Sequence, residues 1–138
     1  MKIETQIIIA APPETVWRIL TDFQRYPQWN PFIKSLSGAV AVGNTIKIEL
    51  PDMTFSPKVL VFDENRELQW RGKLLIKGLF DGEHRFVLEA LPDGATRFLH
   101  SETFSGCLVP LFKNKLINDT TKGFEAMNSQ LKSIAESN

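Results

Sequence analysis

The chain has 138 residues, the size of one ordinary domain, and its formal net charge is zero. It has no basic field to hold phosphates, so we expect no nucleic-acid partner. Charged residues interrupt the N-terminus, no apolar run approaches the roughly 20 residues of a membrane span, and a single cysteine excludes an internal disulfide. We therefore expect a cytoplasmic protein with no membrane span.

The first thirty residues predict one strand and two helices. Residues 2–9 form the strand, because an inward set alternates with mostly polar residues. That inward set is Ile3, Thr5, Ile7 and Ile9. Pro13 fits the first turn of a helix, and Glu14 suits the positive end of its dipole. The inner face of this helix holds Val16, Trp17, Ile19 and Leu20. Prolines limit residues 22–30 to a short second helix and a turn.

The middle of the chain predicts six strands. Apolar residues there have a period close to two, and turn residues recur about every ten positions. The expected strands are 32–41, 44–50, 55–63, 66–74, 79–91 and 95–104, with turns at Gly43-Asn44, Asp63-Glu64-Asn65, Gly78 and Pro92-Asp93-Gly94. Short connections predict an antiparallel sheet, because parallel strands need long crossovers.

The last segment predicts a long amphipathic helix over residues 113–135, because its apolar residues follow at steps of three or four. They are Leu116, Thr120, Phe124, Met127, Leu131 and Ile134. One face of a seven-stranded sheet must be covered, and this helix carries the matching stripe. The sequence thus predicts one α+β domain over residues 1–138. Its order is strand, two helices, six strands and helix, with a curved antiparallel sheet around the C-terminal helix.

Three parts of the chain carry a family resemblance. They are Tyr26-Pro27-Gln28-Trp29-Asn30-Pro31-Phe32-Ile33, the strand Gly94–Gly106, and Pro110, Gly123-Phe124, Met127-Asn128 and Leu131-Lys132 in the closing helix. They resemble polyketide cyclase/dehydrase-type members of the SRPBCC superfamily, which also includes START lipid-binding domains and birch-pollen-allergen-like proteins. The resemblance implies a helix-grip fold with a cavity between sheet and helix. It supplies no fixed catalytic residue.

The last hairpin decides which residues face that cavity. Residues 91–95 suit a three-residue loop with Gly94 in the left-handed region, and this register pairs His84 with Glu102. A two-residue turn is the alternative, and it would send these partners to opposite faces. We favour the longer loop because it keeps the phenylalanines of both strands together. The concave face then holds Phe80, Gly82, His84, Phe86, Leu88, Thr96, Phe98, His100, Glu102 and Phe104.

Both histidines and one glutamate therefore point into the cavity. Directly opposed residues have Cβ atoms about 5 Å apart, so His84 and Glu102 can share the hydrogen bond that a buried carboxylate needs. His100 completes the group. Three interpretations stay open: an internal polar network, a polar anchor for an apolar ligand, and a catalytic acid–base pair. Only residue type supports a divalent metal here, so we predict no metal site.

The expected cavity wall is mostly aromatic. It consists of Trp70, Phe80, His84, Phe86, Phe98, His100, Glu102, Phe104, Phe124 and Met127. Candidate gate residues are Trp29, Met53 and Phe55. For Trp29 we favour the alternative of a structural plug that locks the two helices to the sheet, and for Met53 and Phe55 structural packing is an equal explanation. No Gly-rich phosphate loop, Ser-His-Asp pattern or close cysteine pair occurs, so we expect no cofactor.

The leading functional hypothesis is a protein that binds a small hydrophobic molecule, whether aromatic, polyketide-like or lipid-like. One alternative is a polyketide cyclase/dehydrase-type enzyme that uses a His/Glu acid–base pair in the same cavity. A second is a protein-interaction module with no ligand, which would have a small or collapsed cavity and an exposed apolar patch on the outer sheet or first helices. We expect a monomer or a weak homodimer.

Overall fold

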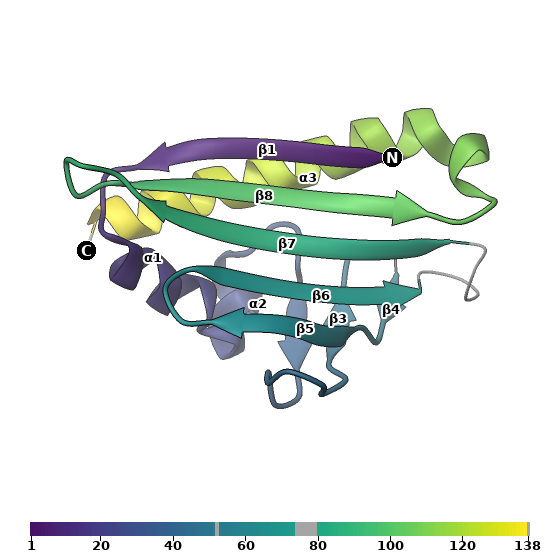
Figure 1. Ribbon diagram of the computed structural model, residues 1–138, viewed down its shortest axis with the longest axis horizontal. Coiled ribbons are helices and arrows are strands. Elements are labelled where there is room, and N and C mark those ends of the chain that lie inside the picture. The colour runs from purple at the N-terminus through teal and green to yellow at the C-terminus, as the bar shows by residue number, and fades with distance from the viewer. Residues whose placement is uncertain (52, 74–79, 138) are drawn as a thin grey trace.

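The computed structural model describes residues 1–51, 53–73 and 80–137 (Figure 1). Its elements, in chain order, are β1 (Lys2–Ile9), α1 (Pro13–Leu20), the 3-10 turn η1 (Phe23–Arg25), α2 (Tyr26–Trp29), β2 (Ser35–Ser37), β3 (Lys47–Glu49), β4 (Thr54–Phe55), β5 (Lys58–Asp63), β6 (Glu67–Lys73), β7 (Asp81–Ala90), β8 (Thr96–Ser105) and α3 (Val109–Ser137). The predicted α+β class and helix-grip architecture are confirmed.

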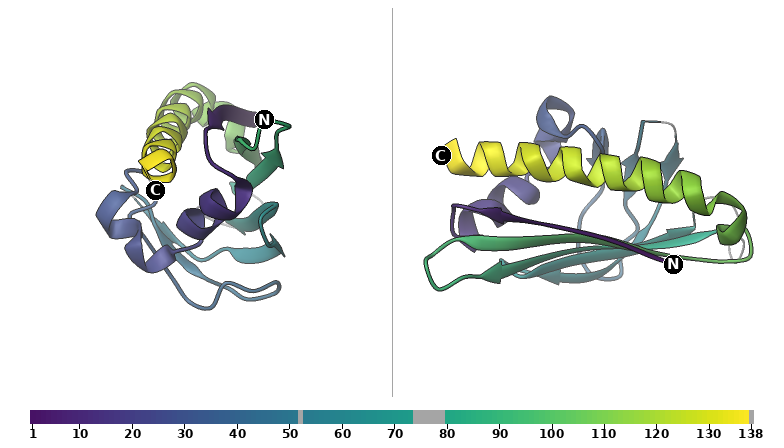
Figure 2. Two further views of the ribbon diagram at one scale, coloured as in Figure 1. Left: turned by 90° about the vertical axis from the view of Figure 1, so that its left-hand side faces the viewer. Right: turned by 90° about the horizontal axis from the view of Figure 1, so that it is seen from above.

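A five-stranded antiparallel sheet and the long helix α3 dominate the molecule. The strand order is β1-β8-β7-β6-β5, and α3 runs lengthwise behind β1 and β8 (Figures 1 and 2). The predicted alternation in β1 is confirmed, because Ile3 and Ile9 are buried while Lys2 and Glu4 are exposed. On α3, the buried stripe includes Phe124, as predicted. Among the described residues, no helix is apolar enough over a sufficient length to cross a membrane.

The strand count corrects the prediction of a single seven-stranded sheet. The described residues form eight strands in two sheets, the second being β2-β3-β4. The predicted strand 55–63 is divided at Pro57, which has no N–H to donate to a ladder. A bridge between Thr45 and Lys58, and a hydrogen bond of 2.9 Å from Ile46 N to Pro57 O, link the two sheets at this point.

Other boundaries also differ from the predicted ones. The predicted strand 32–41 is reduced to Ser35–Ser37, because Gly38 has a φ of 103° and leaves the extended conformation. The predicted strand 44–50 is reduced to Lys47–Glu49, and the closing helix begins four residues before position 113. The predicted turn at Gly78, like positions 74 and 79, lies outside the described residues.

The register of the β7–β8 hairpin matches the prediction. Leu91 N donates to Ala95 O over 2.9 Å, and Gly94 has a φ of 88°, as the three-residue loop requires. His84 pairs with Glu102, and Phe86 pairs with His100. The side chains of His84 and Glu102 therefore leave the same face of the sheet.

Candidate functional site

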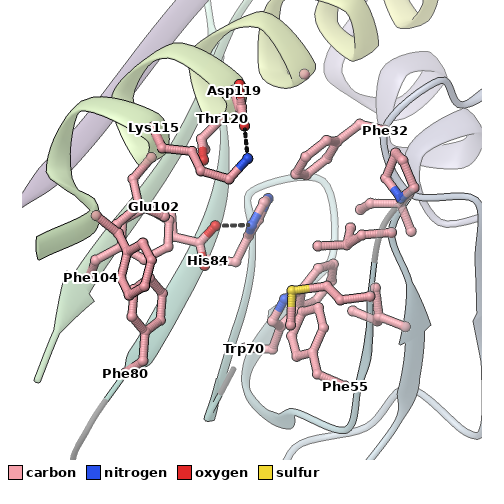
Figure 3. Close-up of a pocket in the computed structure, with 18 of the residues that line it drawn as sticks. Phe32, Phe55, Trp70, Phe80, His84, Glu102, Phe104, Lys115, Asp119 and Thr120 are labelled. Atoms are coloured by element: carbon pink, nitrogen blue, oxygen red, sulfur yellow. Dashed lines mark hydrogen bonds and ion pairs between the residues drawn. The ribbon is translucent and has the colours of Figure 1, made fainter. Parts of the chain in front are cut away.

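A cavity of about 480 Å³ opens between the large sheet, the first half of α3 and the segment 31–55 (Figure 3). This volume lies within the range of small-molecule sites. Its lining is mostly apolar. The lining residues are Pro31, Phe32, Ile33, Ile48, Leu50, Pro51, Met53, Phe55, Trp70, Phe80, His84, Glu102, Phe104, Phe112, Lys115, Leu116, Asp119, Thr120 and Gly123.

Aromatic rings form much of the wall. Trp70 on β6 stacks on His84 on β7, with ring centroids 5.1 Å apart and an interplanar angle of 20°. Phe80 and Phe104 meet edge to face at 5.8 Å. Phe32 lies against Gly123 of α3, where an added Cβ would come within 2.4 Å of the ring. Gly123 is thus the point at which the helix admits a ring from the facing segment.

A chain of hydrogen bonds runs from the cavity wall into the core. Glu102 Oε1 is 3.2 Å from His84 Nδ1, and His84 Nε2 is 2.7 Å from His100 Nε2. His100 Nδ1 is 2.8 Å from Asn128 Oδ1. Asn128 Nδ2 donates to Thr5 Oγ1 over 2.9 Å, and this hydroxyl donates to the His100 carbonyl over 2.9 Å. All residues of this hydrogen-bond chain are buried except Thr5, which is partly buried.

The carbonyl at the inner end fixes the direction of the whole chain. A carbonyl oxygen only accepts, so Thr5 donates to it and its hydroxyl oxygen accepts from the Asn128 amide. Asn128 Oδ1 then accepts, so His100 carries its proton on Nδ1. Neutral His100 therefore accepts at Nε2 from His84 Nε2–H. Without a further proton, His84 Nδ1 and Glu102 Oε1 would both be acceptors. Their contact therefore contains one proton, which is bound to one of these two atoms.

The environment of His100 keeps that imidazole neutral. Burial and the electrostatic interaction with His84 hold the pKa of His100 well below its ordinary value of 6.5, and the hydrogen bond to Asn128 opposes the shift only in part. His100 also stacks on Phe124 of α3, with centroids 3.8 Å apart. The lowered pKa therefore supplies the neutral form of His100, in which Nε2 accepts a hydrogen bond.

Two charged side chains of α3 lie at the edge of the cavity. Lys115 Nζ and Asp119 Oδ2 form an ion pair of 2.7 Å, and both side chains line the cavity where α3 borders it (Figure 3). Thr120 lies one position further along the helix and is buried. The site thus has an ionic rim, an aromatic body and one buried polar wall at Glu102 and His84.

A family model described as polyketide cyclase/dehydrase and lipid transport matches residues 1–136. The chain belongs to this family. No curated protein sequence is significantly similar to it.

Solved structures share the fold of this polyketide cyclase/dehydrase family member at low identity. A hypothetical protein from Helicobacter pylori has a TM-score of 0.84 and 17% identity, over 98% of this chain and 88% of the other. The ZhuI aromatase/cyclase from Streptomyces sp. R1128 has a TM-score of 0.79 and 15% identity, over 99% and 93%. A START superfamily protein from Mycobacterium smegmatis has a TM-score of 0.70 and 21% identity, over 96% and 98%.

The structure divides the residues expected on the cavity wall into two groups. Five of them line the cavity: Trp70, Phe80, His84, Glu102 and Phe104. The other five are buried in the core and do not line it: Phe86, Phe98, His100, Phe124 and Met127. The reason is the close approach of α3, whose Phe124 stacks on His100 and fills the space over that part of the sheet.

The candidate gate residues also separate. Met53 and Phe55 line the cavity. Trp29 does not; its ring meets Tyr26 edge to face at 5.4 Å and packs on the core. The Tyr26 hydroxyl donates to the Leu20 carbonyl, so this cluster joins α2 to the end of α1. Trp29 therefore packs against the core and does not border the cavity.

Several important side chains were not predicted from the sequence. Asn128 and Thr5 extend the polar chain, and each had a signal, because each is a polar residue within an otherwise apolar inward pattern. Phe32 had a weaker signal, since it was placed at the start of a strand that begins only at Ser35. Its place beside Gly123 depends on how two distant segments meet.

His84, His100 and Glu102 have side chains of the types that hold divalent metals. Over the described ranges, no group of three His, Cys, Asp or Glu side chains is arranged to hold a metal ion. The two histidines instead contact each other through Nε2, so these nitrogens belong to one hydrogen bond.

Proposed function

We propose that this protein binds a small, largely apolar molecule in the cavity between the large sheet, α3 and the segment 31–55. The observation that carries the proposal is a cavity of about 480 Å³ with walls that are mostly apolar and aromatic. Membership of a family described by polyketide cyclisation and lipid transport supports it. The cavity volume favours ligand binding over the interaction-module hypothesis, for which we expect a small or collapsed cavity.

The test is a fluorescence titration with N-phenyl-1-naphthylamine, a neutral hydrophobic fluorophore. The proposal predicts saturable binding of one molecule per chain. Leu116 is half-buried and lines the cavity, so Leu116→Trp should occupy part of the space and weaken binding at least about tenfold.

The matched control uses the next residue of the helix. Ile117 is exposed to solvent, so Ile117→Trp should leave the affinity unchanged. Non-saturable binding, or equal affinity for both tryptophan variants, would show that the fluorophore does not enter this cavity. Native mass spectrometry of freshly purified protein adds a direct search for a co-purified molecule.

A second candidate is an enzyme of the cyclase or dehydratase kind. The observation that favours it is the His84–Glu102 contact of 3.2 Å at the cavity wall, a geometry suited to moving a proton. Its mark would be loss of turnover with ligand binding retained in His84→Gln. Parallel losses of binding and turnover would argue for a role in binding alone.

A further inference from the structure

The hydrogen-bond chain determines what Glu102 offers to a ligand. One proton occupies the contact between His84 Nδ1 and Glu102 Oε1. It lies either on His84, opposite an ionised carboxylate, or on Glu102 Oε1. In both arrangements the second carboxyl oxygen, Oε2, carries no proton and acts as a hydrogen-bond acceptor.

This acceptor belongs to the cavity wall. Glu102 lines the cavity, and no hydrogen bond to Oε2 is formed by any residue in the described ranges. Apolar rings, including Phe80 and Phe104, line the same cavity. A donor brought there by a ligand gains a hydrogen bond away from bulk water, where such bonds discriminate strongly.

A second polar group on the same wall needs a partner. The indole N–H of Trp70 is buried and, within the described part of the chain, has none. Buried donors in folded proteins are nearly always paired, so this N–H is an exception on a residue that lines the cavity.

We propose that the cavity selects neutral, largely aromatic molecules that carry a hydroxyl or N–H group and donate it to Glu102 Oε2. This inference rests on the proposed function and names the ligand class for the same site. An ionised carboxylate has no donor and would set its oxygens against Oε2, so fatty-acid-like anions are disfavoured. His84, His100, Asn128 and Thr5 are positioning residues, because they fix the proton that keeps Oε2 an acceptor.

The experiment is isothermal titration calorimetry of the full chain at pH 7 with four naphthalene probes. 2-Naphthol donates and accepts, 2-methoxynaphthalene only accepts, naphthalene does neither, and 2-naphthoate is an anion. We expect 2-naphthol to bind at least about tenfold more tightly than its methyl ether, since a good hydrogen bond to such an acceptor supplies this factor. 2-Naphthoate should bind more weakly than 2-naphthol.

Two variants identify the acceptor. Glu102→Gln keeps an amide oxygen, a weaker acceptor, and should reduce the preference for 2-naphthol over the ether to roughly threefold. Glu102→Leu removes the acceptor and should reduce it to about one. The control is Glu89→Leu, an exposed carboxylate on the neighbouring strand that pairs with Arg97 at 3.3 Å, which should keep the full preference.

The outcomes separate this inference from the proposed function. If no probe binds, the proposed function fails. If the probes bind but 2-naphthol and its ether bind equally, the cavity stands and the inference is overturned. A preference that survives Glu102→Leu would also overturn it, because the donor would then meet another group. The four-probe series on the unmodified chain distinguishes the first two outcomes even if a variant does not fold.

Discussion

His100 shows how a single buried side chain constrains both the core and the site. Its imidazole is fully buried, donates to Asn128 and accepts from His84, so it must stay neutral for the chain of hydrogen bonds to hold. The protein thereby places a titratable group where its charged form is excluded. Such a group makes folding depend on pH.

The free energy of unfolding should decrease as the pH falls below about 6.5, the ordinary histidine pKa. In the unfolded chain the His100 imidazole takes up a proton in this range, whereas in the folded chain its lowered pKa prevents this. The unfolded state then binds more protons and is favoured by acid, at most by about 1.4 kcal/mol per pH unit for one group. Urea unfolding at steps from pH 7.5 to 5.5 measures the slope.

The variant His100→Gln provides the comparison for this slope. Glutamine keeps hydrogen-bonding atoms but does not titrate, so the variant should be less stable at pH 7.5 and show a flatter dependence on pH. Equal slopes in the two proteins would mean that His100 is not the group responsible.

At the scale of elements, helix α3 meets the segment after α2 at a single small residue. Gly123 lies where an added Cβ would be 2.4 Å from Cδ1 of Phe32, and Phe32 in turn stacks with His84 at 6.3 Å. Glycine within a helix costs about 1 kcal/mol relative to alanine, so helix propensity alone favours replacement. The packing requires the opposite.

Gly123→Ala should therefore destabilise the protein by about 1–3 kcal/mol, despite its better helix propensity, because the Phe32 ring must move. The ring is on the cavity wall, so affinity for N-phenyl-1-naphthylamine should change as well. Lys122→Ala, at the exposed neighbouring position, is the control and should change stability by only a few tenths of a kcal/mol. A Gly123→Ala protein as stable as the unmodified chain would refute the close-packing argument.

Local patterns predicted the elements better than the contacts between them. The β7–β8 register could be derived because its loop and the alternation of phenylalanines agree, and it correctly placed His84 opposite Glu102. The second sheet could not be derived. The apolar alternation continues through Pro57 and therefore predicts one strand. Pro57 has no N–H to donate to a ladder, and it lies between β4 and β5.

For the candidate site too, local patterns predicted which residues are buried but not which contacts they make. All ten expected wall residues are buried, but burial alone does not separate a cavity wall from a filled core. That separation depends on where α3 touches the sheet. Phe124 closes the space over His100, while Phe32, from a segment assigned to a strand, bounds the space that stays open. Such contacts join distant residues, as when Phe32 meets Gly123, and lie beyond any local period.

At the scale of the whole molecule, the cavity lies between a large five-stranded sheet and a small three-stranded sheet. β7 and β8 each have 10 residues and β1 has 8, so their ladders are long. In contrast, β2 and β3 have 3 residues each and β4 has 2. Short strands with few backbone hydrogen bonds open with less free energy than long ones. The small sheet is therefore the wall that a ligand can stabilise most.

Binding of N-phenyl-1-naphthylamine should slow amide hydrogen exchange selectively in the small sheet, which contributes Ile48 and Phe55 to the cavity wall. A ligand stabilises the states in which its contacts exist, so exchange that requires β3 and β4 to separate from the cavity becomes rarer. Exchange measured by mass spectrometry, with and without the fluorophore, should show at least about threefold slowing over residues 44–51. The hairpin tip at 91–95 lies outside the cavity lining and should be unaffected, and Leu116→Trp should abolish the effect. Uniform slowing over the whole chain would instead mean that residues 44–51 exchange only through global unfolding. The small sheet would then not open separately from the rest of the protein.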